Sequence, residues 1–127
     1  MANAKGTFEV KLTPEQDASG ESIVGKMSID KHFQGDIEGT SRGLMLMAGT
    51  AVQGSAGYVA LEKVTASIDG KSGTFYLQHN GIMNRGEGSL KVVVIPDSGT
   101  EELTGLGGSM SIKIEDGKHY YEFDYQI

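Results

Sequence analysis

Residues 108–127, GSMSIKIEDGKHYYEFDYQI, carry the clearest structural pattern in the chain. Apolar side chains recur at every second position on both sides of Asp116-Gly117, a residue pair that favours a type I′ turn. If Glu115 pairs with Lys118, one face of the resulting hairpin is almost wholly apolar and the other is polar. A shift of one residue would mix the two faces, so the pattern predicts an antiparallel hairpin in this register. Tyr121, Phe123 and Tyr125 lie on its apolar face.

The same two-residue period recurs along the whole chain and predicts eight strands. We expect them at residues 5–12, 22–34, 36–48, 56–68, 73–80, 87–95, 108–115 and 119–127. Short connections predict antiparallel neighbours in chain order, and an up-and-down β-barrel is the arrangement that leaves such a sheet without edges. The expected fold is therefore all-β, a single eight-stranded antiparallel β-barrel over residues 1–127. A two-sheet sandwich is the alternative that the pattern leaves open.

The composition excludes several functional classes. The chain has 127 residues, 19 of them glycine, and a net charge of -6 with no basic run, which argues against nucleic-acid binding. It has no cysteine, so thiol catalysis and disulfides are excluded. The first residues, MANAKGTFEV, contain no signal-peptide core, and no segment is long enough to span a bilayer. We expect a cytoplasmic protein without a membrane or nucleic-acid partner.

The hairpin at residues 57–81, GYVALEKVTASIDGKSGTFYLQHNG, places two titratable residues on one apolar face. Either a two-residue turn at 69–70 or a four-residue turn at 69–72 puts Glu62 on the same face as His79, directly opposite or one diagonal away. Tyr58, Phe75 and Leu77 share that face. Burial would raise the pKa of Glu62, and a neighbouring imidazolium would oppose the rise. The pair could move a proton or orient a ligand, or its members could simply satisfy one another.

Other motifs give weaker signals. The three histidines lack metal-ligand spacing, so no metal site is expected, and no glycine pattern has the context of a nucleotide-binding loop, so no cofactor is expected. Glu38 and Arg42 share one face of residues 36–48, but the loop parity does not determine whether that face points inward. We interpret them as an exposed ion pair. In the segment 96–107, Ser98 or Thr100 could cap one helical turn at residues 101–103.

Taken together, GDIEGTSRG, GYVALEKV, DGKSGTFYLQHNGIMNRG, VVVIPDSGT and LTGLGGSMSIKIEDGKHYYEFDY resemble the bacterial domain-of-unknown-function family numbered 3224, over nearly the whole chain. The resemblance implies a β-barrel of the allene oxide cyclase type and a homo-oligomer, either a dimer or a trimer. Matching positions are Tyr58, Glu62, Phe75, His79, 96–100 and Tyr125. The family usually has glycine after Thr100, where this chain has Glu101.

These observations lead to three hypotheses about function. The first is that the barrel binds a small, largely apolar organic molecule, with Glu62 and His79 as polar anchors. Its expected contacts are Tyr58, Phe75, Leu77, Tyr121, Phe123 and Tyr125. The second is a cofactor-independent isomerase, cyclase or lyase in which Glu62 and His79 are catalytic. The third is a structural oligomer subunit, which predicts an apolar face on the outside of the sheet.

Overall fold

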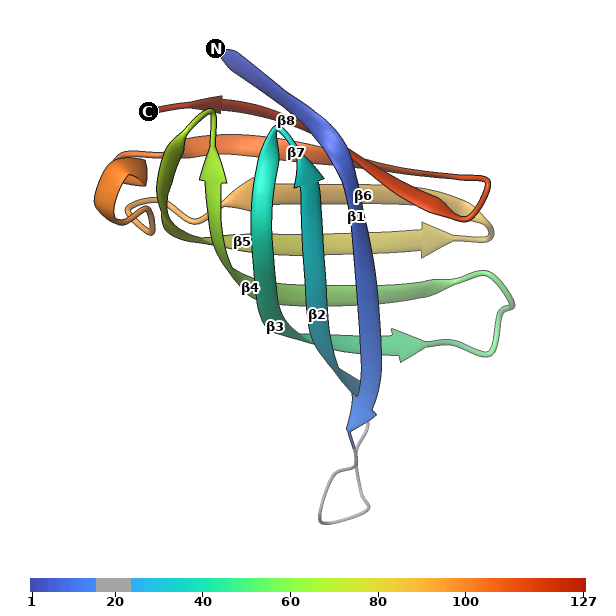
Figure 1. Cartoon of the computed structure of the whole chain (residues 1–127). Helices are drawn as coiled ribbons and strands as arrows, with labels where there is room; N and C mark the ends of the chain where they lie inside the picture. Colours follow the sequence, from blue (N-terminus) through green and yellow to red (C-terminus); the bar gives the residue numbers. More distant parts are fainter. Residues whose placement is uncertain (16–23) are drawn as a thin grey trace.

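The computed structural model describes residues 1–15 and 24–127, which form a closed barrel of eight antiparallel strands in chain order (Figure 1). The expected all-β barrel is confirmed, and the two-sheet sandwich is not formed. The elements are β1 (Ala2–Glu15), β2 (Gly25–Gly35), β3 (Ile37–Gly49), β4 (Ala56–Ile68), β5 (Lys71–Asn84), β6 (Glu87–Val94), the short 3₁₀ helix η1 (Glu101–Leu103), β7 (Gly107–Glu115) and β8 (Lys118–Gln126). Of the strand expected at 22–34, residues 22 and 23 lie outside the described residues.

Two hairpin turns set the register of β4 with β5 and of β7 with β8. Ile68 pairs with Lys71 and Glu115 pairs with Lys118, so both turns have two residues. Asp69 and Asp116 have φ angles of 50° and 52°, and the glycine after each also has a positive φ. Two successive residues with positive φ are what a type I′ turn requires, which explains the Asp-Gly sequence at both places. The register predicted for residues 108–127 is confirmed.

The barrel interior contains a large and a small apolar cluster. Phe123 is fully buried in the large cluster and stacks between Phe75 and Tyr125, with ring centroids 6.1 and 5.3 Å away. The small cluster consists of Ile29, Met45 and Ala60, with Val10, Met27 and Tyr58 packed against it. Along β2, β3 and β4, buried polar residues separate the two clusters. The interior is therefore divided into two apolar regions with a polar layer between them.

The inward face of β3, which the sequence left open, carries Ile37, Ser41 and Met45. Glu38 and Arg42 are exposed, as expected. The ion partner of Arg42 is Asp30 on β2, at 3.3 Å, and not Glu38. The reason is geometric, since Asp30 lies directly opposite Arg42 in the β2–β3 register.

The segment after β6 forms η1, but neither expected hydroxyl caps it. The Oγ of Ser98 accepts a hydrogen bond from Tyr76 N at 3.1 Å, and the Oγ1 of Thr100 accepts one from Thr74 N at 2.9 Å. Both hydroxyls thus bind the edge of β5 beyond the end of β6, and Leu103 is fully buried beneath them. Glu101 has a φ of 53°, a conformation that favours glycine. This is the position where the resemblance implied glycine.

The strand contacts around the barrel are uneven. β3 pairs with β4 over 13 residue pairs, and β1 pairs with β8 over seven. β6 and β7 are joined by two residue pairs, Val92 with Met110 and Val93 with Ser109. We call this short contact the β6–β7 seam. Beyond it, the two strands separate toward the β5–β6 and β7–β8 turns.

Candidate functional site

Four polar side chains meet inside the barrel, one each from β2, β3, β4 and β5. The Oε2 of Glu62 lies 2.6 Å from His79 Nε2 and accepts a hydrogen bond from Lys31 Nζ at 2.8 Å. Its Oε1 accepts a hydrogen bond from Ser41 Oγ at 2.9 Å. All four residues are at most 8% exposed. The predicted contact between Glu62 and His79 is present, and we call the four residues the interior cluster.

The two-residue turn at Asp69-Gly70 explains how Glu62 reaches His79. Glu62 is paired with Leu77 in the β4–β5 register and Ala60 with His79, so the carboxylate and the imidazole are diagonal neighbours. On the other side, Gly43 pairs with Glu62. A Cβ at Gly43 would lie 2.1 Å from the Leu61 carbonyl oxygen and 2.8 Å from Glu62 Cβ, so the close approach of β3 to β4 requires glycine there.

The environment of Glu62 lowers its pKa to about 2. Burial acts to raise the pKa, but it is outweighed by the hydrogen bond from His79 and by the charge and hydrogen bond of Lys31. Both effects expected from the sequence are present, burial raising the pKa and His79 opposing the rise, and Lys31 adds a further lowering that was not expected. A carboxylate with this pKa is ionised throughout the neutral range and accepts hydrogen bonds without donating any.

Lys31 and Ser41 are the two cluster residues that were not predicted from the sequence, and only Lys31 left a signal there. The alternation of residues along β2 indicated that Lys31 points inward, because Ile29, Lys31 and Phe33 occupy successive positions on one face. The Lys31 ammonium lies 4.7 Å from the centre of the Phe8 ring and 5.8 Å from that of Phe33, so aromatic faces and one carboxylate surround it. A lysine on the apolar face of a strand predicts a buried acidic partner.

The interior cluster leaves no buried polar group without a partner. Among the described residues, every fully buried side-chain nitrogen and oxygen atom has a hydrogen-bond partner. Glu62 has donors on both of its oxygens. Its carboxylate is therefore occupied by the protein itself and does not face a ligand.

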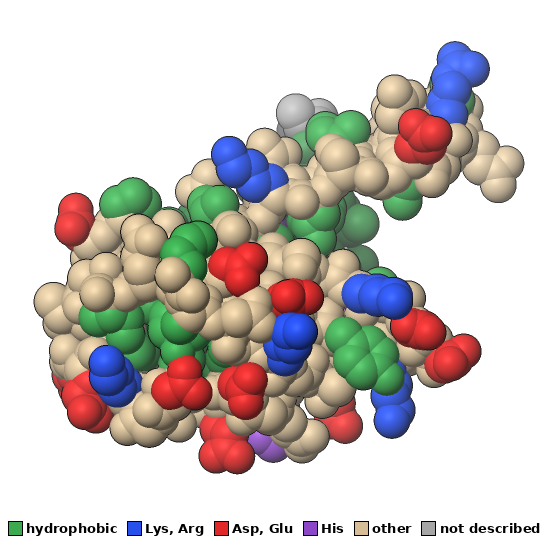
Figure 2. All heavy atoms as spheres, turned by 90° about the horizontal axis from the view of Figure 1, so that it is seen from above, with side chains coloured by type: hydrophobic (Ala, Val, Ile, Leu, Met, Phe, Trp, Pro, Cys, Tyr) green, Lys and Arg blue, Asp and Glu red, His purple; other side chains and the backbone are tan. Residues whose placement is uncertain are grey.

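A cavity of about 440 Å³ opens at the mouth of the barrel, beside the small apolar cluster. Its lining is mostly apolar and spans β3 to β7: Met47, Ala56, Gly57, Tyr58, Gly81, Ile82, Met83, Gly88, Ser89, Leu90, Ser111 and Ile112. We call it the mouth cavity. It includes residues from both strands that separate beyond the β6–β7 seam. Seen from above, the molecule has hydrophobic side chains in a hollow beside a projecting arm (Figure 2).

Tyr58 connects the mouth cavity to the interior cluster. Its ring lies 6.3 Å from that of His79, and it packs over Gly81, where a Cβ would lie 2.2 Å from a Tyr58 ring carbon. Among the described residues, the Tyr58 hydroxyl has no hydrogen-bond partner. Every fully buried polar side-chain atom among them does have one, so the Tyr58 oxygen is exposed to solvent. Burial and the charge of Glu62 raise the pKa of Tyr58. The hydroxyl is therefore protonated at neutral pH and able to donate.

The other five residues predicted to contact a ligand lie in the large apolar cluster. Phe75, Leu77 and Phe123 are fully buried there. The Tyr121 hydroxyl accepts a hydrogen bond from Ile37 N at 2.8 Å and donates one to Gln34 O at 3.0 Å. The Tyr125 hydroxyl donates to Asp69, a bond that raises its pKa to about 12. None of the five lines the mouth cavity, and their contact with a ligand stays a prediction.

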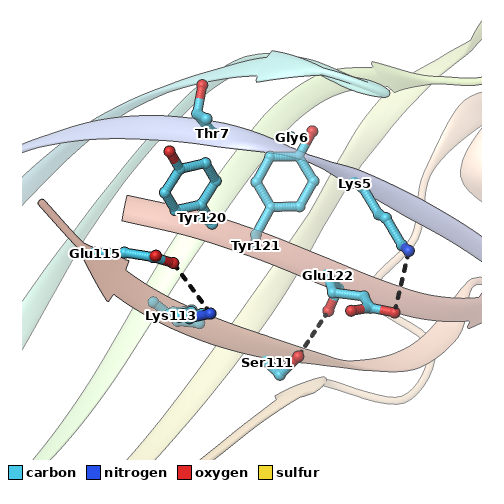
Figure 3. Close-up of a pocket in the computed structure, with 10 residues that line it drawn as sticks. Lys5, Gly6, Thr7, Ser111, Lys113, Glu115, Tyr120, Tyr121 and Glu122 are labelled. Atoms are coloured by element: carbon cyan, nitrogen blue, oxygen red, sulfur yellow. Dashed lines mark hydrogen bonds and ion pairs between the residues drawn. The ribbon is translucent and has the colours of Figure 1, made fainter. Parts of the chain in front are cut away.

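A second cavity, of about 610 Å³, lies over the outer surface of β1, β8 and β7 (Figure 3). Charged side chains at its rim pair with one another: Lys113 with Glu115 at 3.0 Å, and Lys5 with Glu122 at 3.8 Å. All four are at least half exposed. Exposed pairs of this kind contribute little energy. Among the described residues, every fully buried polar side-chain atom already has a partner, so this cavity offers none for a ligand to satisfy.

Two classes of site receive no support from the described residues. They contain no group of three or more histidine, cysteine or acidic side chains placed to hold a metal ion. They also form no helix that is both long and apolar enough to cross a membrane.

Comparisons with known proteins give the family of the chain. Residues 4–125 match the model of a family described as a protein of unknown function, DUF3224. The crystal structure of a protein with unknown function from the DUF3224 family of Shewanella oneidensis MR-1 is 51% identical, with a TM-score of 0.92, covering 100% of this chain and 97% of that chain. No curated protein matches the sequence. The family resemblance seen in the sequence is confirmed, and the chain belongs to the DUF3224 family.

Proposed function

We propose that the protein binds a small, largely apolar organic molecule carrying one polar group, and that it does so in the mouth cavity. The observation that carries the proposal is an apolar cavity of about 440 Å³ with the unpartnered hydroxyl of Tyr58 at its wall. Small-molecule sites typically combine such a volume with a few polar groups that fix orientation. Tyr58 would donate a hydrogen bond to the polar group of the ligand, while the side chains of Met47, Met83 and Leu90 cover its apolar part.

In this proposal the interior cluster lies beneath the mouth cavity and fixes the position of the residues at its base. Glu62 fixes the orientation of His79 through a 2.6 Å contact, and His79 lies against the ring of Tyr58. Because both oxygens of Glu62 are occupied, the carboxylate acts on a ligand through His79 and Tyr58. Glu62 is thus proposed as a positioning residue, and Tyr58 as the group that touches the ligand.

Filling the mouth cavity should weaken binding strongly. A Cβ at Gly88 would make ordinary contact with Met83, at 3.7 Å, so a larger side chain can enter the cavity there. We expect Gly88→Leu to weaken binding of the fluorescent probe N-phenylnaphthylamine at least tenfold. Gly107→Leu is the matched control, since Gly107 also has room for a Cβ and lies outside the cavity. Equal probe affinity in wild type and both variants would contradict the proposal.

Removing the Tyr58 hydroxyl should change selectivity more than overall affinity. A hydrogen bond in a protein contributes about 1 kcal/mol, which corresponds to roughly a fivefold change in affinity. Tyr58→Phe should therefore weaken binding of naphthol by about this factor and leave that of methylnaphthalene nearly unchanged. Isothermal titration of both probes measures the ratio. An unchanged ratio would show that Tyr58 does not anchor the polar group.

The second candidate is a cofactor-independent isomerase, cyclase or lyase. Its specific support is the short contact between Glu62 and His79, which fixes Nε2 as the nitrogen facing the carboxylate. Since Glu62 has a pKa of about 2, His79 would be the group that moves the proton. Conversion of a bound compound that is lost in His79→Asn and retained in Tyr58→Phe would support this candidate. Binding without conversion in the wild type would contradict it.

A further inference from the structure

The outside of β3, β4 and β5 carries a continuous set of apolar side chains. Leu44 lies opposite Leu61, and Leu46 lies opposite Val59 in the β3–β4 register. Tyr76 on β5 lies diagonal to Leu61. Between 41% and 51% of each of these residues is exposed. We call Leu44, Leu46, Val59, Leu61 and Tyr76 the outer apolar face, and a shallow groove of about 860 Å³ runs over it.

The exposed apolar area of this face is large enough to mark an interaction site. At these exposures the five residues present on the order of 400–500 Å² of surface, in the range where apolar patches mark interaction sites. A standard interface takes about 800 Å² from each partner, with an apolar centre and a polar rim. The outer apolar face supplies about half of that area and would form the apolar centre of such an interface. Lys26, Arg42 and Lys63, which also line the groove, supply a rim.

The charges of that rim oppose contact with an identical surface only weakly. Lys26 is paired with Glu15 at 3.5 Å and Arg42 with Asp30 at 3.3 Å, so two of the three cations carry their own counter-charge. Only a small positive surplus remains on this face, although the chain as a whole has a net charge of -6. Two copies of an acidic protein repel each other least where the local charge is close to neutral. Among the described residues, the only charged ones that line the groove are these three cations.

We propose that the outer apolar face is the interface of a symmetric dimer, in which a second copy of the chain packs the same face against it. Each copy contributes one apolar sheet face, and two sheets that pack face to face lie about 10 Å apart with their side chains interdigitating. A two-fold contact buries Leu44, Leu61, Leu46 and Val59 of both copies at once. Lys63 lies at the rim, where its ammonium group stays in water.

The absence of cysteine from the chain allows a direct test of the contact. We expect Leu61→Cys to form a covalent dimer in high yield with a short bis-maleimide at micromolar protein. Ile114→Cys is the control, because Ile114 is also an exposed aliphatic residue, at 65%, but lies on β7 outside the face. This variant should run as a monomer on a denaturing gel. Equal yields from the two variants would overturn the proposal.

A charge at the centre of the face should dissociate the dimer. Leu61→Lys should raise the dissociation constant at least about tenfold, and Ile114→Lys should leave it unchanged. Sedimentation velocity measures the masses, and circular dichroism with a thermal melt confirms that each variant is folded. A wild-type protein that sediments as a monomer at 100 µM, or a dimer unaffected by Leu61→Lys, would overturn the proposal. Neither result bears on the mouth cavity, since Leu61 does not line it.

Discussion

Glu62→Gln should reduce the free energy of unfolding by about 3–5 kcal/mol, because it leaves the Lys31 ammonium buried without its counter-charge. Both side chains are almost fully buried, at 0% and 6% exposure, so water cannot replace the lost carboxylate. For a domain of this size the loss corresponds to a fall in Tm of about 10–20 °C. Urea denaturation followed by circular dichroism measures it.

Two further variants identify the cause of that loss. If the unpaired ammonium is responsible, Lys31→Met combined with Glu62→Gln should be less destabilised than the sum of the two single variants. Glu122→Gln is the control at the surface, where Glu122 pairs with Lys5 at 3.8 Å and both are at least half exposed; it should cost less than 1 kcal/mol. A loss below 1 kcal/mol in Glu62→Gln, or simple additivity in the double variant, would contradict the assigned role of the pair.

Acid should remove the contribution of the same carboxylate. The pKa of Glu62 is about 2 in the folded protein and 4.5 without the fold. A lowered folded-state pKa means that the stabilisation is complete above pH 4.5 and is lost as the pH falls toward 2. The difference corresponds to about 3 kcal/mol. Unfolding free energies measured by urea denaturation from pH 7 to pH 2.5 should decline most steeply below pH 4.5.

Glu62→Gln isolates this titration from those of the other acidic residues. The variant lacks the titrating group, so the gap in stability between it and the wild type should narrow as the pH falls. Exposed carboxylates titrate in both proteins and cancel in the comparison. A gap that stays constant from pH 7 to pH 2.5 would show that the Glu62 pKa is not lowered by the fold.

The contact between Glu62 and His79 could be predicted because it depends on local information. Loop parity is fixed by the Asp69-Gly70 turn, and either turn length considered places the two residues on one face. Tyr121, Phe123 and Tyr125 were assigned to the inside for the same reason. Their side chains pack in the large apolar cluster, and alternation alone does not tell whether an inward side chain meets another side chain or an open cavity.

Lys31 and Ser41 could not be placed in the same way. They approach Glu62 across the β2–β3 and β3–β4 pairings, and the inward face of β3 depended on a parity that the sequence left undetermined. The net direction of the Glu62 pKa shift was therefore left open, since Lys31 adds its charge and hydrogen bond to the effect of His79 in opposing burial. The mouth cavity also depends on where β6 and β7 separate, which no single segment encodes.

The β6–β7 seam also bears on how a molecule bound in the mouth cavity, as proposed, would exchange with solvent. With two residue pairs to break, opening there disrupts far fewer backbone hydrogen bonds than opening at any of the longer strand pairings. The strands on either side carry Leu90 and Ile112, which line the mouth cavity. A brief local separation would widen the entrance while the remaining strands keep their pairing. For the proposed ligand, the seam would therefore be a route into and out of the cavity that does not require global unfolding.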